Sequence, residues 1–171
     1  GVEGGVRAEA QTPKEVTISL REAASVSELL RFRDQVGTFN QVHLHVALES
    51  LEVLLKRHAL PFSSCGAEGE GFVAAVLSRV GELAAVGAFN DRSVLSTLRH
   101  ASNFGVLPRA ADAFMGRVLE VARTCAARDA ANVAEHLARW QVPLGAELGR
   151  VLQRRAEDLR GRAEDLRGGA R

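Results

Sequence analysis

The sequence predicts an all-α fold, an α-solenoid of about three helix–turn–helix repeats plus a C-terminal helix. A unit of two apolar, helix-like stretches occurs three times, over Val26–Pro61, about Gly71–Pro108 and Arg109–Pro143. Each copy ends in a Leu-Pro or Val-Pro pair, and the first two copies share one joint, Phe39-Asn40 and Phe89-Asn90. Helix–turn–helix repeats of roughly 35–45 residues are typical of stacked α-solenoids.

Composition and charge narrow the class of protein further. Among 171 residues aromatic side chains make up only 5% and Tyr is absent. Ala, Leu, Val and Arg dominate the composition, which favours helix over strand. No stretch approaches the roughly 20 apolar residues of a membrane-spanning helix, so we expect no membrane span. The net charge of +1 excludes a global polycation. Arg outnumbers Lys 20 to 2, which suits bidentate phosphate contacts but also follows from coding bias in a GC-rich genome.

Residues 1–24 are expected to form an N-terminal tail. Gly1–Lys14 is small, polar and glycine-rich, which predicts an extended segment. Val16–Leu20 alternates well enough for a short extended stretch. The chain starts with Gly and its only Met is Met115, which loss of an organellar transit peptide would explain.

The first repeat is expected over 25–61. Ser25 is a candidate N-cap of its first helix, which Gly37 ends. Asn40 is the candidate N-cap of a second helix that runs to Lys56.

The second repeat is expected within 62–108. Its opening segment Phe62–Gly71 is rich in Gly, Ser and acidic residues and predicts a loop. A first helix then begins at Phe72 and ends at Gly87, and a second helix runs to Phe104.

The third repeat is expected over 109–143. Its first helix runs from about Ala110 to Cys125, its joint is degraded to Ala127-Arg128-Asp129, and its second helix ends near Trp140.

Residues 144–171 predict a charged C-terminal helix that begins near Ala146. The heptad RAEDLRG occurs twice, at 155–161 and 162–168, with only Leu159 and Leu166 as large apolar residues. This stripe is too thin for a core, so we expect a protruding or fraying helix with Glu/Arg pairs. A partner-binding helix and solvated low-complexity sequence both remain open.

The joint residues have a mechanical interpretation. A Phe at the turn fills the gap between neighbouring repeats, and the Asn beside it caps the second helix. Gly37 and Gly87 stand two residues before each Phe, where a left-handed C-cap is expected.

The stretch that begins Ala24-Ser-Val-Ser-Glu-Leu-Leu and continues at Phe39-Asn-Gln-Val-His-Leu resembles the opening unit of octotricopeptide repeat proteins. The later segments FNDRSVLSTLRHASNFGVLP and RDAANVAEHLARWQVPLG are similar to second helices of those repeats and of the heptatricopeptide and FAST-kinase-like repeats. The resemblance covers about 25–143. It implies a twisted α-solenoid of mitochondria or plastids that binds organellar RNA, in some cases as a subunit of a mitochondrial ribosome.

RNA contacts would be made by exposed basic and polar residues on the repeat helices. A solvated helical face is the alternative for each of them, and Arg99 with Asn103 is the best local pair. The candidates are Arg92, Arg99, His100, Asn103, Arg109, Arg117, Arg123, Arg128, Arg139, Arg150, Arg154 and Arg155.

Catalytic and metal-binding motifs are not found in the sequence. His43 and His45 are poorly spaced for one metal ion, and Cys65 and Cys125 belong to no CxxC pair. Walker A, HExxH and GxSxG motifs are missing, so we expect no catalytic residue, cofactor, metal or small-molecule substrate.

These observations and the resemblance together predict a non-catalytic RNA-binding protein, most specifically a mitochondrial ribosomal subunit that contacts rRNA and neighbouring proteins. One alternative is a protein-binding scaffold or accessory subunit of another organellar complex, which the near-zero net charge favours. Another is a free organellar RNA processing or stability factor. The compartment is expected to be the mitochondrion, with the plastid as the alternative.

Overall fold

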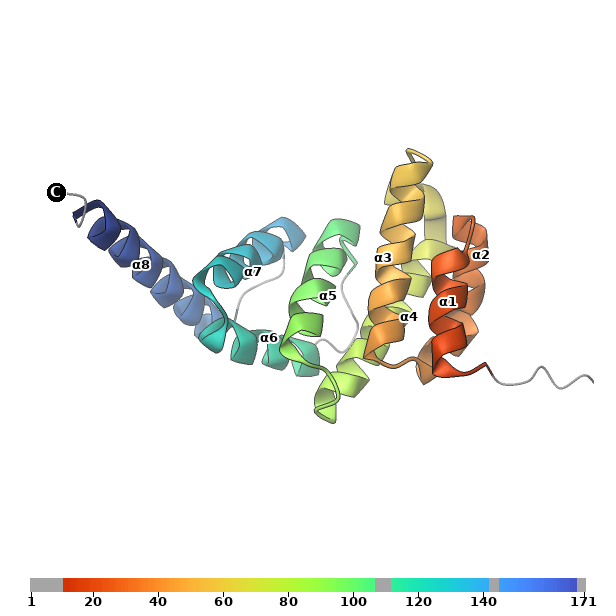
Figure 1. The fold of residues 1–171 in the computed structure, drawn as a ribbon, viewed down its shortest axis with the longest axis horizontal. Coiled ribbons are helices and arrows are strands. Elements are labelled where there is room, and N and C mark those ends of the chain that lie inside the picture. The colour runs from red at the N-terminus through yellow and green to blue at the C-terminus, as the bar shows by residue number, and fades with distance from the viewer. Residues whose placement is uncertain (1–10, 107–111, 142–144, 169–171) are drawn as a thin grey trace, which may run out of the picture.

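The computed structural model describes residues 11–106, 112–141 and 145–168. Over these ranges the protein is all-α, with eight α-helices, two 3-10 helices and no strand, which confirms the predicted class (Figure 1). The α-helices are α1 (Pro13–Glu22), α2 (Val26–Leu30), α3 (Gln41–Arg57), α4 (Gly66–Ala85), α5 (Asp91–Phe104), α6 (Asp112–Thr124), α7 (Ala127–Trp140) and α8 (Ala146–Gly168). The 3-10 helices are η1 (Arg31–Thr38) and η2 (Phe62–Cys65).

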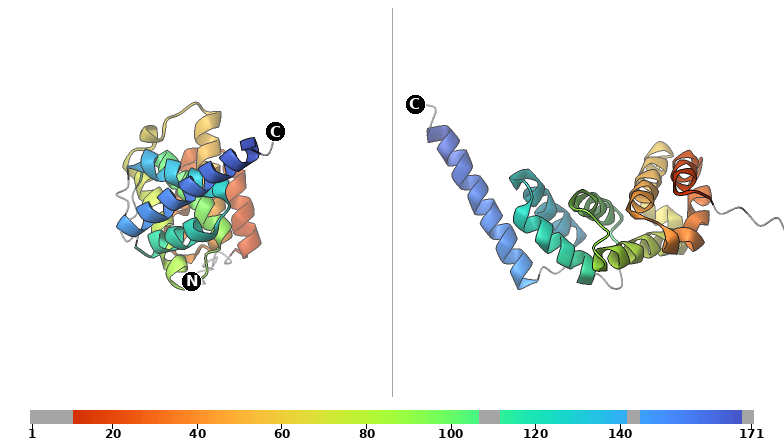
Figure 2. Two further views of the ribbon diagram at one scale, coloured as in Figure 1. Left: turned by 90° about the vertical axis from the view of Figure 1, so that its left-hand side faces the viewer. Right: turned by 60° about the horizontal axis from the view of Figure 1, so that its bottom comes forward.

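The helices lie in two rows. Helices α1, α3, α5 and α7 form one row in which each helix packs on the next, and α2, α4, α6 and α8 form the other in the same way. Helices that follow one another in the chain also pack across the rows, as α3 does on α4 and α5 on α6. Figure 2 shows this order along the molecule, with α8 at the end opposite to α1. No helix of the described residues combines the length and the apolar character that crossing a bilayer requires.

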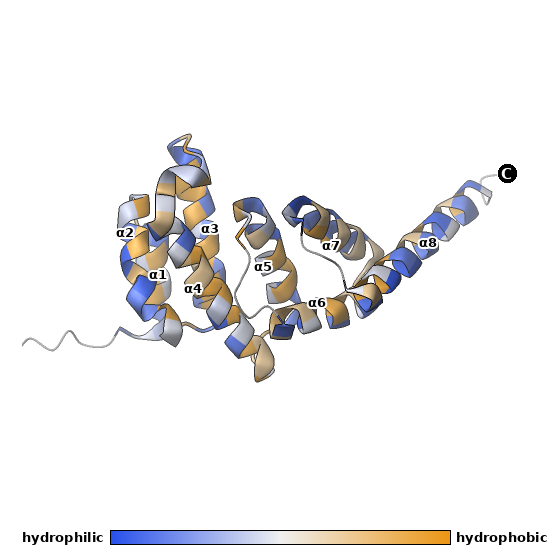
Figure 3. Ribbon diagram, turned by 180° about the vertical axis from the view of Figure 1, so that it is seen from behind, coloured by the Kyte–Doolittle hydropathy of each residue, from blue (hydrophilic) through white to orange (hydrophobic). Residues whose placement is uncertain are grey.

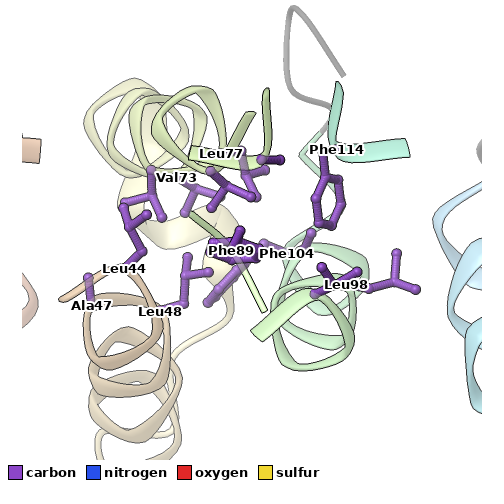
Figure 4. Close-up of a cluster of buried hydrophobic side chains, with 14 of the residues drawn as sticks. Leu44, Ala47, Leu48, Val73, Leu77, Phe89, Leu98, Phe104 and Phe114 are labelled. Carbon is purple, nitrogen blue, oxygen red and sulfur yellow. The ribbon is translucent and has the colours of Figure 1, made fainter. Parts of the chain in front are cut away.

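One hydrophobic core runs between the two rows. Figure 4 shows its middle part, where Leu48 of α3, Leu77 of α4 and Leu98 of α5 surround Phe89. Phe114 extends the same cluster to α6. The apolar stripes that the sequence placed at helical spacing face this layer, whereas polar residues lie on the outer faces (Figure 3).

The N-terminal expectation was wrong between residues 13 and 22, because Val16–Leu20 lies inside helix α1. The Thr12 hydroxyl accepts a hydrogen bond from the Glu15 backbone N–H at 3.3 Å, and the Glu15 carboxylate accepts one from Thr12 N–H at 3.2 Å. Pro13 then occupies the first turn, where its missing N–H costs nothing. These start signals, together with burial of Leu20 against α3, override the strand preference of the β-branched residues.

Histidine 43 ties the start of α1 to α3. Its Nδ1 accepts a hydrogen bond from Asn40 N–H at 3.2 Å, so the proton of the neutral ring sits on Nε2. This Nε2–H donates to the Pro13 carbonyl at 2.8 Å. The Asn40 side chain caps α3 in return, because its Oδ1 accepts from His43 N–H at 2.9 Å.

Of the four features predicted for the two joints, namely the buried Phe residues, the capping Asn residues and the left-handed Gly37 and Gly87, three are observed. Phe39 and Phe89 are buried, and Asn40 and Asn90 cap α3 and α5. Gly87 adopts a left-handed φ of 71° and ends α4. Gly37 does not, because the first helix changes into η1, which runs through Gly37 to Thr38.

The loop expected over Phe62–Gly71 is also wrong, because η2 and the first turns of α4 occupy it. Glycine content suggested a loop, but here it allows close packing. A Cβ atom on Gly69 would lie 2.2 Å from Cys65 Cβ, and one on Gly71 would lie 2.8 Å from the Arg33 guanidinium. The small residues therefore let α4 begin early, against its own preceding turn and η1.

Replacing Gly69 with Ala is expected to lower the free energy of unfolding by about 1–3 kcal/mol, because Cys65 Cβ has no flexible end that could move away. Gly116→Ala is the matched control, since Gly116 lies inside α6 with no atom within 4 Å of its added methyl group. It should raise the free energy of unfolding by about 0.5–1 kcal/mol. Urea unfolding of both variants checks the pair, and equal effects would contradict the packing at Gly69.

The third helix pair begins its second helix earlier than expected. Ala127-Arg128-Asp129 forms the first turn of α7, so the joint is Cys125-Ala126. No side chain caps α7 at Ala126, and this is why the sequence placed the joint too late. The repeat ends Pro108 and Pro143 and the start of the predicted helix at Ala110 lie outside the described residues.

Helix α8 begins at Ala146 as expected and continues through both heptads to Gly168. Its first half packs on α6 and α7, and its second half projects beyond them (Figures 1 and 2). The Glu/Arg pairs expected inside the tandem heptad do not form among the described residues.

Candidate nucleic-acid interface

Three arginines of the second row make the same contact. Arg79 Nε donates a hydrogen bond to the Phe39 carbonyl at 2.9 Å, and an Arg117 Nη donates to the Phe89 carbonyl at 3.1 Å. Arg155 donates to the Cys125 carbonyl in the same way. The three arginines are 38 residues apart in sequence (79 to 117 and 117 to 155). Each one satisfies a carbonyl at the joint of the preceding helix pair, where the helix itself supplies no donor.

Because of this contact, Arg117 and Arg155 differ from the other residues that were predicted to bind RNA. Arg117 also pairs with Asp91 at 2.7 Å and with Glu120, and these hydrogen bonds raise the pKa of its guanidinium group. Arg155 is half-buried. Their charges are engaged inside the protein, so we assign them a structural role.

A groove with a mixed polar and apolar lining crosses α5 on the face of the first row. Its volume is about 780 Å³, and it extends from α3 over α5 to α7 and the end of α6. Its lining combines polar and apolar side chains. The apolar ones are Val42, Leu95, Val121, Cys125 and Val133. The basic and neutral polar ones are Gln41, His45, Asn90, Arg92, Ser93, Ser96, Arg99, Thr124, Asn132 and His136, and the acidic ones are Asp91 and Asp129.

Arg92 and Arg99 are the two arginines of this groove. Both are exposed and form no ion pair within the described residues. They are two turns apart on α5, so their guanidinium groups follow one face of the helix. Asp91 pairs with Arg117, which also pairs with Glu120, and Asp129 is the second carboxylate of the lining, so the positive charge of the groove is local to Arg92 and Arg99.

Hydrogen bonds between side chains hold the floor of the groove. Ser96 Oγ and His45 Nδ1 are 2.8 Å apart, which joins α5 to α3. Next to them Glu52 accepts from His100 Nδ1 at 2.8 Å and from Asn103 at 3.0 Å. Arg139 of α7 donates to Asn103 Oδ1 at 3.1 Å, so one chain of polar contacts connects three helices.

Burial shifts the titration of these groups. It lowers the pKa of His45 and of His136 and so favours their neutral rings, which act as hydrogen-bond donors and acceptors in the groove. Burial alone would raise the pKa of the Glu52 carboxyl. The hydrogen bonds from His100 and Asn103 outweigh burial and hold that pKa below its ordinary value.

The remaining candidates are one buried residue, three residues engaged in contacts, three exposed residues away from the groove and one residue outside the described ranges. His100 is only 1% exposed, so the expectation of an exposed basic residue is wrong there, because the ring is buried between α5 and α3 beside Glu52. Asn103 and Arg139 belong to the polar chain, and Arg123 pairs with Glu147. Arg128, Arg150 and Arg154 are exposed, away from the groove lining, and Arg109 lies outside the described residues.

Sequence reasoning missed several groove residues. Gln41, His45, Asn132 and His136 line the groove, although none was among the candidates. A signal existed, because polar residues that alternate with the buried stripe of a second helix must point to the first row's outer face. Which of those residues meet across helices was not available from the sequence.

No group of three or more His, Cys, Asp or Glu side chains that could hold a metal ion occurs in the part of the chain that the structure describes.

Comparisons of the chain with known protein families, with known proteins and with solved structures gave no match. The groove is therefore interpreted from its own chemistry.

Proposed function

We propose that this protein is an RNA-binding α-solenoid whose groove across α5 holds a single-stranded RNA segment. The observation that carries the proposal is the groove itself, in which Arg92 and Arg99 stand beside neutral amide, hydroxyl and imidazole groups. Arginine binds phosphates, whereas the neutral polar groups match the hydrogen-bonding edges of unpaired bases.

The solenoid part of the proposal is supported by the order of the helices. Each row adds helices in chain order, and an arginine fixes each new pair to the joint before it. Such nearest-neighbour packing is the defining property of repeat arrays, which present one continuous face of second helices.

The resemblance to organellar helical-repeat proteins supports a proposal for the role in the cell. We propose a non-catalytic subunit of a mitochondrial ribosome that contacts rRNA and neighbouring proteins. Its net charge of +1 suits a protein embedded in a large assembly, where a local groove rather than a global charge meets RNA. A protein-binding scaffold of another organellar complex is the second candidate, which the same small net charge favours.

Replacing both Arg92 and Arg99 with Gln should weaken binding of a fluorescent single-stranded RNA at least tenfold. It should also reduce the slope of log K against log salt by about 1.4, because two phosphate contacts are lost at about 0.7 per contact. Fluorescence anisotropy between low and physiological salt measures both quantities. Arg31→Gln with Arg57→Gln is the control, since it removes the same charge from exposed positions outside the groove.

An equal loss in both double variants would contradict the groove and leave only general electrostatic attraction.

For the cellular role, sedimentation of mitochondrial extracts with and without RNase is the test. Migration with ribosomal particles that RNase abolishes supports the rRNA-bound subunit, whereas RNase-insensitive migration with a protein complex supports the scaffold.

A further inference from the structure

The outer half of α8 carries an apolar stripe that nothing in the described residues covers. Leu148 and Leu152 near the start of α8 are buried against α6 and α7. Leu159 is only half-buried, and Leu166 is 79% exposed. Ala156 and Ala163 are exposed as well and lie between the leucines on the same face, because the spacing is three and four residues.

The recurring arginine contact shows what this face corresponds to in the rest of the protein. When α4, α6 and α8 are aligned at Arg79, Arg117 and Arg155, Ala156 of α8 is equivalent to Val80 of α4 and Val118 of α6. Val80 and Val118 are both 0% exposed. At Ala156, helix α8 thus exposes a position that its two counterparts bury.

The charged residues beside this apolar stripe of α8 determine which partner surface is able to bind to it. Arg162 lies along one edge of it, and Arg160 and Arg167 lie along the other. All three are exposed and make no ion pair among the described residues, whereas the acidic residues of the heptads lie farther round the helix. The surface is therefore an apolar seam with positive borders.

We propose that residues 156–167 of α8 form a docking site for an α-helix of another protein whose apolar stripe is bordered by Asp or Glu. Over residues 156–161 the partner helix takes a position that neighbouring helices take on α4 and α6, and beyond these residues α8 extends past the ends of its two counterparts. A second copy of α8 does not fit, because its arginine borders would face those of the first copy. This site lies outside the groove and goes beyond RNA binding.

The test uses the full chain and two synthetic helical peptides with the same leucine stripe, one bordered by Glu and one by Lys. By fluorescence anisotropy the Glu peptide should bind at least tenfold more tightly than the Lys peptide. Leu166→Ser should abolish most of this binding, because the seam loses its most exposed leucine. Val86→Ser is the matched control, since Val86 is an exposed apolar residue (76%) at the end of α4.

Reversing the borders gives a second, independent readout. The variant Arg162→Glu with Arg167→Glu should lose the Glu peptide and gain the Lys peptide, with an unchanged Tm that shows an intact fold. Equal binding of both peptides, or a preference that the reversal leaves unchanged, would overturn the proposal. So would a chain that dimerises by sedimentation and loses its dimer with Leu166→Ser.

RNA serves to separate the two proposals. Single-stranded RNA binding should be the same in the wild-type chain and in Leu166→Ser, because the groove across α5 is untouched. Loss of RNA binding in Leu166→Ser would reassign α8 to RNA and overturn the helix-docking site. Failure of the Arg92 and Arg99 variants to affect RNA would instead overturn the groove alone.

Discussion

Replacing Phe89 with Ala is expected to lower the free energy of unfolding by about 3–5 kcal/mol, the usual cost of deleting a buried aromatic ring. Phe89 is 3% exposed and lies at the centre of the cluster that α3, α4 and α5 form (Figure 4). Its backbone carbonyl is held by Arg117 and cannot follow the lost side chain into the gap. A rigid joint relaxes little, so the cavity term stays large.

Urea unfolding followed by circular dichroism measures this loss, with Val86→Ala as control. Val86 lies three residues away but is 76% exposed, so its truncation should change the free energy of unfolding by less than about 0.5 kcal/mol. The midpoint of Phe89→Ala should fall without a change in m, because the surface exposed on unfolding is similar. Similar losses in both variants would contradict the buried joint.

Replacing Leu20 with Ala is expected to cost about 2–5 kcal/mol, the range for a leucine removed from a packed core. Leu20 is 0% exposed and lies on the face of α1 that packs against α3. A residue in an extended tail would have no such effect, so this variant separates the helix from the tail that the sequence suggested.

Ile18→Ala is the matched control for Leu20. Ile18 belongs to the same helix and is 44% exposed, so its loss should stay near about 0.5 kcal/mol. Amide hydrogen exchange of α1 in the Leu20 variant provides the second readout, since α1 should open more often than α3 once its anchor is removed. A Leu20 variant as stable as wild type would contradict the packing of α1.

The helix pairs were predictable because their signals are local. Asn40, Asn90 and Gly87 act through hydrogen bonds to residues within one turn, and the apolar stripes repeat at the helical period. The sequence predictions were wrong where they were based on local residue composition and ignored the tertiary contacts of those residues. Glycines near Gly69 suggested a loop although they serve packing, and the alternation of Val16–Leu20 was used without considering the cap and the proline that start α1.

The candidate site was only partly predictable for a different reason. Arg92 and Arg99 were identified from residue type and face, and the structure places them in the groove. Arg117 looks the same in sequence, but Phe89 and Asp91, the partners that occupy it, precede it by more than twenty residues. Residue type shows what a side chain is able to bind, and the fold decides whether that capacity is already used.

The sequence by itself therefore determined the helical class, the order of the pairs and the two capped joints, because caps and periodicity act within a few residues. Only the tertiary structure decided that α1 packs on α3, that His100 is buried beside Glu52, and that Arg79 holds a joint. These outcomes depend on contacts between residues some 30 to 50 positions apart, which the burial of one shared core brings together.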